Sequence, residues 1–339
     1  MNDLSVGVVG LGLGRHFLDA CRRSEMVWRL VVCDADAAAV ERVRAAGVEI
    51  DAAYADVDAM LAAEGLDAAC VVTPDHLHRP HAEACLAAGC HVLLTKPLAT
   101  NLADGRAILR AADAVGRKLM VAHERRFRPA NVAIKRMIDA GELGEIIELR
   151  IDAIQDKRRQ FTDRPWYASA EAGRTALVGS GIHEVDLVRW FAGREVELVF
   201  AFSNRLGTLS FPADKTTAAL FRFAGGAVGQ VTVTYEAHWP PAGGPASPYR
   251  IVGSKGVVID GRVAVDGNEQ WRDLPTSARP AMVEGIHGCV ADFLDAVVRD
   301  RPVSITGRDA FDSLAAAVAA DRSAATGAPV VPVPFDAHG

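Results

Sequence analysis

Residues 5–17, SVGVVGLGLGRHF, run from a short apolar segment through three closely spaced glycines into a helix-type segment. This order is typical of the first strand, turn and helix of a dinucleotide-binding unit. Gly10 permits a tight turn, and Gly12 lets the backbone approach a pyrophosphate. The following helix offers N–H groups to that anion. The third glycine is Gly14, so Arg15 stands where the usual GxGxxG spacing has glycine.

An acidic residue supports the same interpretation. Asp34 ends the second apolar segment, 22 residues after Gly12. An acid at this position accepts hydrogen bonds from both ribose hydroxyls of NAD. It also repels the additional phosphate of NADP, so the sequence predicts NAD as the cofactor, with NADP as the alternative. A glycine-rich strand–helix turn without a ligand is the other interpretation of the motif alone.

Short apolar runs alternate with amphipathic segments up to about residue 123: SVGVVG, WRLVVCD, VEI, DAACVVT, HVLLTK and RKLMVAH. Such alternation predicts a parallel sheet covered on both faces by helices. Later segments, such as EVELVFAFSN, are longer and mix apolar with polar residues, which favours a mostly antiparallel sheet. The predicted fold class is α/β. We expect a Rossmann domain over residues 1–123 and a second α/β domain with a large open sheet over 124–339, including helices near 281–299 and 307–323.

Composition excludes several classes of protein. The net charge is −6 and no basic run occurs, so we expect no nucleic-acid partner. No apolar run is long enough to span a membrane, and the first residues lack the features of a signal peptide. The six cysteines are scattered without a CxxC pair, which predicts buried free thiols in a reducing compartment. We therefore expect a cytoplasmic protein that acts on a small molecule.

Two polar stretches follow the fourth and fifth predicted strands: VVTPDHLHRPH (71–81) and HVLLTKPLATN (91–101). Ligands of open parallel sheets bind at the carboxyl ends of strands. Lys96 therefore lies where hydride transfer requires a cation, although a solvated strand-end lysine is the alternative. The three histidines of the first stretch lack companion cysteines or acids, so we predict no metal site. The predicted cofactor contacts are Gly10, Gly12, Leu13, Gly14, Asp34, Thr73, Pro74, His78, Thr95 and Lys96.

The chain resembles the glucose-fructose oxidoreductase/inositol dehydrogenase/MocA family along nearly its whole length. The resemblance rests on GLGLGRH with Asp34, TPDHLHRPHAEACLAAGCHVLLTKP, HERRFRPANVAIKRMIDAGELGEI (123–146), GSGIHEVDLVRW (179–190) and the segment FLDAVVRDRPVSITGRDAFDSLAAAVAADRSAATGAPV. It implies a Rossmann domain and an α/β domain whose open sheet often forms the oligomer interface. It also implies a homodimer or homotetramer that oxidises a secondary alcohol of a sugar, inositol or related polyol with NAD(P).

The resemblance also assigns residues. The lysine of the family's Glu-Lys-Pro motif falls on Lys96, and the histidine of its Asp-x-Gly-x-His motif falls on His183. Three positions depart from the family pattern. Thr95 replaces the motif glutamate, Gly179 replaces the aspartate that handles protons in many relatives, and Glu124 replaces a common asparagine.

Chemistry gives these residues roles. Oxidation of a carbinol requires a base for the hydroxyl proton, and His183 is the best candidate because histidine titrates near neutral pH. Asp186 lies at i+3 from His183 on an expected helix and is a candidate to orient its ring. Lys96 would stabilise the negative charge that develops on the substrate oxygen. Glu124 is a second supporting candidate. The alternative is that His183 is a packed histidine paired with Asp186.

The sequence gives only candidates for the residues that recognise the substrate. Sugar rings stack on aromatic side chains, and the candidates for this contact are Trp166, Tyr167, Tyr235 and Trp239. Arg158, Arg159 and Arg174 suit a carboxylate or phosphate, or a solvated surface. The alternative function is a relative that is not a dehydrogenase: a hydrolase or lyase that uses NAD transiently, or a regulator that binds NAD and a sugar. The absence of aspartate at 179 favours this alternative, whereas the presence of both Lys96 and His183 favours a dehydrogenase.

Overall fold

The computed structural model describes residues 4–240, 243–244 and 249–336. The chain forms two compact units. The first contains residues up to Phe127 together with Arg279–Phe311, and the second contains Arg128–Ala278 together with the residues from Asp312 onward. The predicted domain boundary at 123/124 lies close to the point where the chain first passes from the first unit to the second, between Phe127 and Arg128. The chain nevertheless returns to the first unit late in the sequence, whereas we had expected every residue after 123 to belong to the second.

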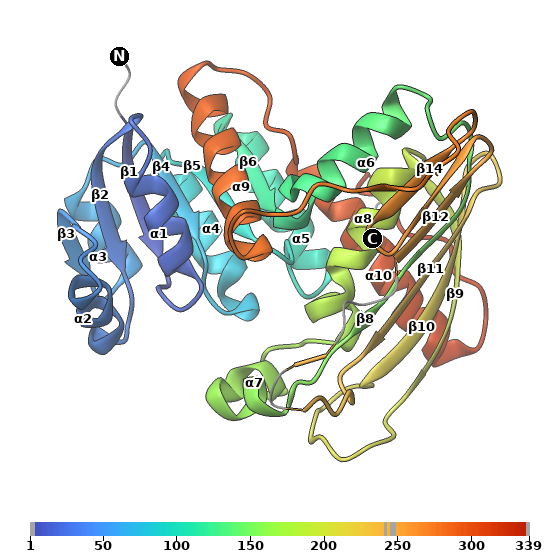
Figure 1. Ribbon diagram of the computed structural model, residues 1–339. Helices are drawn as coiled ribbons and strands as arrows, with labels where there is room; N and C mark the ends of the chain where they lie inside the picture. Colours follow the sequence, from blue (N-terminus) through green and yellow to red (C-terminus); the bar gives the residue numbers. More distant parts are fainter. Residues whose placement is uncertain (1–3, 241–242, 245–248, 337–339) are drawn as a thin grey trace. The chain divides into compact units, whose positions relative to one another are not determined.

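The first unit is built on a six-stranded parallel sheet with the strand order β3-β2-β1-β4-β5-β6 (Figure 1). This arrangement confirms the predicted Rossmann fold. Its strands and helices are β1 (Leu4–Val9), α1 (Gly14–Arg22), β2 (Val27–Cys33), α2 (Ala37–Ala45), β3 (Ala52–Tyr54), α3 (Val57–Ala63), β4 (Ala68–Val71), α4 (His78–Ala87), β5 (His91–Thr95), α5 (Leu102–Val115), β6 (Leu119–Ala122) and α9 (Ala281–Val298).

One strand of this sheet differs from the prediction. We expected the third strand at residues 48–50, but β3 is Ala52–Tyr54. Helix α2 ends at Ala45, Gly47 turns the chain at φ +76°, and Val48 N donates to Val43 O. The apolar residues 48–50 are thus part of the connection from α2, and the strand begins only after it.

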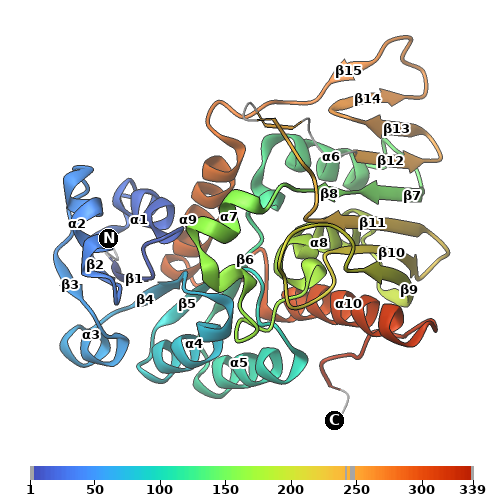
Figure 2. The same ribbon diagram turned by 90° about the horizontal axis from the view of Figure 1, so that it is seen from below.

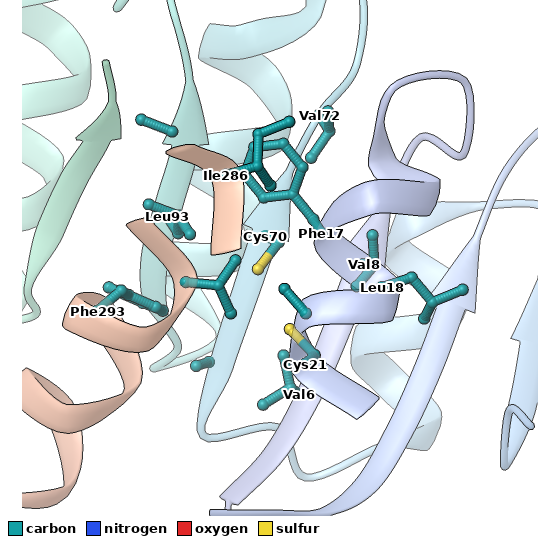
Figure 3. Packing of buried hydrophobic residues seen from close by; sticks show 14 of the residues in the cluster. Val6, Val8, Phe17, Leu18, Cys21, Cys70, Val72, Leu93, Ile286 and Phe293 are labelled. Atoms are coloured by element: carbon teal, nitrogen blue, oxygen red, sulfur yellow. The ribbon is translucent and has the colours of Figure 1, made fainter. Parts of the chain in front are cut away.

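Helix α9 explains why the chain returns to the first unit. Phe293, Ile286 and Cys289 of α9 are fully or almost fully buried, and they pack against α1 and the sheet around Phe17 (Figure 3). All six cysteines are free and buried, as expected, and Cys21 and Cys70 lie within this same core. Burying this apolar helix against the sheet contributes roughly 25 cal/mol per Å² of surface removed from water.

The second unit contains a nine-stranded sheet, drawn strand beside strand in Figure 2. The order is β15-β14-β13-β12-β7-β11-β10-β9, and β8 pairs with β11. Among the strand pairs that the structure describes in this sheet, only β11–β7 and β11–β8 are parallel, which confirms a mostly antiparallel sheet. The strands are β7 (Ile146–Ile151), β8 (Ala153–Ile154), β9 (Val196–Asn204), β10 (Thr216–Phe223), β11 (Val228–Thr234), β12 (Tyr249–Gly253), β13 (Gly256–Ile259), β14 (Arg262–Val265) and β15 (Arg272–Asp273).

A π-helical turn at Leu177–Gly181 directly precedes α8 and the candidate histidine. The part of the second unit that the structure describes contains four α-helices. They are α6 (Pro129–Asp139), α7 (Arg158–Asp163), α8 (Ile182–Ala192) and α10 (Gly307–Thr326), whose first residues belong to the first unit. Strand β10 alternates strictly between buried and exposed residues, so one face of the sheet packs on the core. Within the described ranges, no helix is long and apolar enough to cross a membrane.

Candidate active site

The glycine loop after β1 has the geometry that a dinucleotide requires. Gly10 adopts φ +86°, and a Cβ there would lie 2.7 Å from Val72 O. A Cβ on Gly12 would meet no atom within 4 Å, which leaves that backbone open to a ligand. A Cβ on Gly14 would touch Val8 and Val72 at 3.4–3.5 Å, so this glycine allows α1 to pack closely on the strands. Gly14 therefore supplies the close packing that the usual motif assigns to position 15.

The Asp34 carboxylate holds this loop in place and still has acceptor positions for a ligand. Its Oδ2 accepts from Leu11 N at 2.7 Å, and its Oδ1 accepts from Asp36 N at 2.9 Å. An ionised carboxylate has about four acceptor positions, so each oxygen retains one for a ribose hydroxyl. The residues present thus fit NAD. Arg15, which sequence reasoning left without a role, donates to Gly12 O at 2.6 Å and places a cation beside the loop.

Replacing Asp34 by alanine should weaken NAD binding by roughly 10-fold or more, because it removes charge-assisted hydrogen bonds to the ribose and the anchor of Leu11 N. NADP should lose less affinity, since the repulsion of its phosphate also disappears. Titration of both cofactors by NAD(P)H fluorescence measures the ratio of dissociation constants. Glu41→Ala, an exposed acid paired with Arg44 on α2, is the matched control. An unchanged NAD/NADP ratio would remove Asp34 from cofactor selection.

The carboxyl ends of β4 and β5 lie side by side, because Val71 pairs with Leu94. Lys96 directly follows β5 and is partly buried. The buried His78 ring lies between two backbone carbonyls, with Nδ1 2.8 Å from Pro97 O and Nε2 3.1 Å from Thr73 O. His78 therefore links the loops that carry Thr73 and Lys96, and its contact with the cofactor stays a prediction.

Two further predicted site residues of the first unit, Thr95 and Glu124, are buried. Thr95 ends β5 and is paired with Ala122 of β6. Glu124 follows β6 in the 3-10 turn Glu124–Phe127, and it is buried. A Cβ on Gly285 of α9 would lie 2.3 Å from Glu124 O, so the helix and this turn approach each other closely.

His183 occupies the first turn of α8 and is only 9% exposed. The glycines before it are required by packing. A Cβ on Gly181 would lie 2.9 Å from Leu177 and 3.2 Å from Val233, so the π-helical turn rests directly on β11. Thr175 Oγ1 accepts from Val178 N at 3.0 Å and so caps the start of this turn. The glycine-containing stretch before His183 is therefore closely packed.

Asp186 lies one turn after His183 and is 1% exposed. Its Oδ1 accepts from Ser313 Oγ at 3.1 Å, and Ser313 Oγ accepts from Arg189 Nη1 at 2.7 Å. These bonds tie α8 to α10. The role of Asp186 in orienting His183 stays a prediction.

The three arginines proposed for anion binding are in different environments. Arg159 is 94% exposed and pairs with Asp163, and Arg158 pairs with Asp156 and donates to Trp239 O. Arg174, by contrast, is 4% exposed and donates from Nη2 to Gly179 O at 2.6 Å. Of these three arginines, Arg174 alone is buried, and it contacts the π-helical turn that precedes His183.

The aromatic residues proposed to contact the substrate also lie in different environments. Trp166 and Tyr167 stack on each other, and the Arg174 guanidinium lies over both rings. Tyr235 is 2% exposed, and its ring packs edge-on against Phe161 and Phe211. A substrate contact through Tyr235 would therefore require a movement of these rings.

A partly buried carboxyl, that of Asp321, lies next to the residue that caps the π-helical turn. Thr175 Oγ1 donates to Asp321 Oδ2 at 2.7 Å. Burial raises the pKa of Asp321 to about 7, the Thr175 hydrogen bond lowers it, and the charge of Asp214 raises it. Asp321 is therefore largely protonated in the folded protein below neutral pH.

Replacing Asp321 by asparagine should stabilise the protein at high pH alone. The folded-state pKa of Asp321 exceeds its ordinary value of 3.8. The contribution of this carboxyl to the free energy of unfolding is therefore fully present below about pH 4 and is lost as the pH rises to about 7. We expect a gain of about 2 kcal/mol in the free energy of unfolding at pH 8, since partial exposure reduces the full effect, and no gain at pH 4. Urea denaturation at both pH values measures it. The same gain at pH 4 would contradict this assignment.

The parallel six-stranded sheet, its glycine loop and Asp34 define a dinucleotide-binding protein. Among the described residues, no cluster of histidine, cysteine or acidic side chains is placed to hold a metal ion. Residues 4–123 match the oxidoreductase family with an NAD-binding Rossmann fold, and residues 131–259 match the GFO/IDH/MocA C-terminal domain. The chain belongs to the GFO/IDH/MocA family of NAD-binding oxidoreductases.

Several characterised relatives are dehydrogenases. Inositol 2-dehydrogenase 1 of Saccharopolyspora erythraea is 29% identical over 96% of this chain and 95% of its own length. D-Apiose dehydrogenase of Paraburkholderia graminis is 32% identical over 64% of this chain and 57% of its own length. Among solved structures, the WlbA dehydrogenase from Bordetella pertussis, in complex with NADH and UDP-GlcNAcA, is 27% identical with a TM-score of 0.82, covering 98% of this chain and 100% of that chain.

Proposed function

We propose that the protein is an NAD(P)-dependent dehydrogenase that oxidises a secondary alcohol of a sugar, inositol or related polyol. The observation that carries this proposal is Lys96, a cation placed directly after β5 at the ligand-binding edge of a Rossmann sheet. The activities of the inositol and apiose dehydrogenases named above support it.

The residues have distinct roles in this reaction. The glycine loop and Asp34 would hold NAD, whose nicotinamide would supply the hydride acceptor. His183 takes the proton of the reacting hydroxyl, a step for which a positioned base contributes roughly 10²–10⁴ in rate. Lys96 donates a hydrogen bond to the same oxygen and stabilises its negative charge. Gly12, Asp34 and the loops linked by His78 bind and orient the cofactor.

The direct test is NADH formation by the purified protein with NAD and a panel of inositols, aldoses, glycosides and sugar acids. We expect absorbance at 340 nm to rise with at least one class of the panel. NAD binding is measured separately by calorimetry. Binding of NAD without reduction by any substrate would count against the dehydrogenase and favour a hydrolase, a lyase or a regulator.

We also propose that the protein is a homodimer or homotetramer assembled through the exposed face of the nine-stranded sheet. Three apolar side chains of this face are largely exposed: Phe202 (68%), Leu220 (55%) and Val228 (49%). The rings of Phe200 and Phe202 pack edge to face. Apolar groups in such number on one sheet face are typical of an interface.

The double substitution Phe202→Asp and Leu220→Asp should reduce the assembly to monomers, because buried unpaired carboxylates oppose association. Light scattering after size-exclusion chromatography gives the mass. Trp28→Asp, which changes an exposed aromatic residue of the first unit, is the control and should leave the mass unchanged. A wild-type monomer would refute the assembly.

A further inference from the structure

The helical segment that carries His183 begins with a side chain that binds its own backbone. Thr175 Oγ1 accepts a hydrogen bond from Val178 N at 3.0 Å, and Thr175 O accepts one from Gly179 N at 2.9 Å. A threonine that accepts from the backbone N–H three residues later has the geometry of an N-cap. The chain then passes through the π-helical turn Leu177–Gly181 and continues as α8, whose second residue is His183. Thr175 therefore fixes the start of the turn that leads to the histidine.

The Thr175 hydroxyl is itself held by a carboxyl of another helix. Thr175 Oγ1 donates to Asp321 Oδ2 of α10 at 2.7 Å. A hydroxyl has one hydrogen and two lone pairs, so donation to Asp321 fixes its rotation and leaves a lone pair for Val178 N. Donation of this hydrogen also makes the oxygen a stronger acceptor. These two hydrogen bonds tie the π-helical turn to α10.

A π-helical turn affects the direction of every side chain that follows it. It contains one residue more than an α-helical turn, and each residue of an α-helix rotates the chain by about 100°. If the turn relaxed to α-helical geometry, the residues after it would rotate by about 100° relative to those before it. The interactions that stabilise the turn Leu177–Gly181 therefore determine where the His183 side chain points.

We infer that Thr175 and Asp321 are positioning residues that hold the π-helical turn and so fix the direction of the His183 base. This inference rests on the proposed dehydrogenase function, in which His183 receives the hydroxyl proton. All three residues belong to the second unit, and the predicted cofactor residues belong to the first. Loss of the Thr175 hydroxyl should therefore lower kcat and leave NAD affinity nearly unchanged.

Thr175→Val removes the hydroxyl and keeps the shape of the side chain. We expect kcat for alcohol oxidation to fall roughly 10-fold, because a misplaced reacting group costs up to about 10²-fold in rate. KM and the dissociation constant of NAD should stay within about twofold of wild type, since neither ligand binds Thr175 in this assignment. Thr175→Ser keeps the hydroxyl and should recover most of the rate.

Substitutions of Asp321 separate the cap from the tie to α10. Asp321→Leu leaves the hydrogen bond from Val178 N to Thr175 and removes the acceptor of the Thr175 hydroxyl, so kcat should fall roughly threefold. Asp321→Asn keeps an acceptor oxygen and should restore most of this loss. Thr326→Val is the matched control, because Thr326 is an exposed threonine of α10 whose hydroxyl donates to Arg322 O. Its kcat should equal that of wild type.

Combination with His183→Ala distinguishes positioning from a general effect on structure. If Thr175 acts only through His183, Thr175→Val should change the residual rate of His183→Ala by less than about twofold. A general loss of structure would lower the rate by the same factor in both backgrounds. Thermal denaturation verifies that each variant is folded at the assay temperature.

The histidine rings also give a measurement that needs no turnover. In protein labelled with ¹³C at histidine Cε1, the NMR signal of His183 is the one that His183→Ala removes. Thr175→Val should shift or broaden this signal and leave that of the half-exposed His238 in place. Thr326→Val should leave both signals unchanged.

Three results would overturn the inference: wild-type kcat in Thr175→Val, an equal loss of rate with and without His183, or a His183 signal that Thr175→Val does not change. If Thr175→Val does not fold, Asp321→Leu, which retains the N-cap, takes its place in the same three comparisons. Absence of oxidation with every compound would instead refute the proposed dehydrogenase, while the NMR comparison would still decide whether Thr175 orients His183.

Discussion

Replacing Lys96 by alanine should lower kcat by roughly 10³-fold while NAD affinity stays within a few-fold of wild type. Lys96 directly follows β5, and its ammonium group is the cation that we assign to the substrate oxygen as negative charge develops. Loss of one donor of this kind costs roughly 10²–10³ in rate. Stopped-flow measurement of NADH formation and calorimetric titration of NAD separate the two effects.

Lys118→Ala is the matched control for Lys96→Ala. Lys118 belongs to the same unit and pairs with Asp300 at 2.7 Å, so its loss removes one charge without touching the β5 end. Its kcat should remain within twofold of wild type. Retained turnover in Lys96→Ala would place the chemistry elsewhere, and a loss of NAD affinity matching the loss of rate would reassign Lys96 to cofactor binding.

The strand, turn and helix that carry the predicted cofactor residues could be predicted from the sequence because their determinants are local. The spacing of Gly10, Gly12 and Asp34 encodes a strand, a turn and a second strand end, and the structure has these elements in the predicted order. Lys96 could be located for the same reason, since it follows an apolar run directly. Backbone geometry of this kind depends on neighbours along the chain.

Other features depend on contacts that no periodicity reveals. The apolar pattern of α9 predicts a helix but not which sheet it covers, so its packing against Phe17 in the first unit was missed. Arg174 looked like one of many surface arginines, and only the structure separates it from the exposed Arg159. The sequence shows that position 179 lacks aspartate, but it does not show that a Cβ there would lie 2.6 Å from Nε of Arg174.

Replacing His183 by alanine should lower kcat for alcohol oxidation by roughly 10²–10⁴-fold, because no positioned base then receives the hydroxyl proton. In wild-type protein, kcat/KM should fall as the pH is lowered, since a protonated imidazole cannot accept a proton. The residual activity of His183→Ala should lack this fall and rise only with hydroxide. His238→Ala, a half-exposed histidine of the same unit, is the control and should keep the wild-type profile.

The combined variant Lys96→Ala/His183→Ala distinguishes a shared chemical step from two separate losses. If both residues act on one substrate oxygen, the second substitution should cost far less than it does alone, because groups that work as a unit are strongly non-additive. If the two residues contribute independently, their losses in kcat would instead multiply, to a total loss of roughly 10⁵-fold or more. A multiplicative result, or a pH profile of His183→Ala that still falls on the acid side, would leave His183 as a packed residue of α8 and assign the proton to another group.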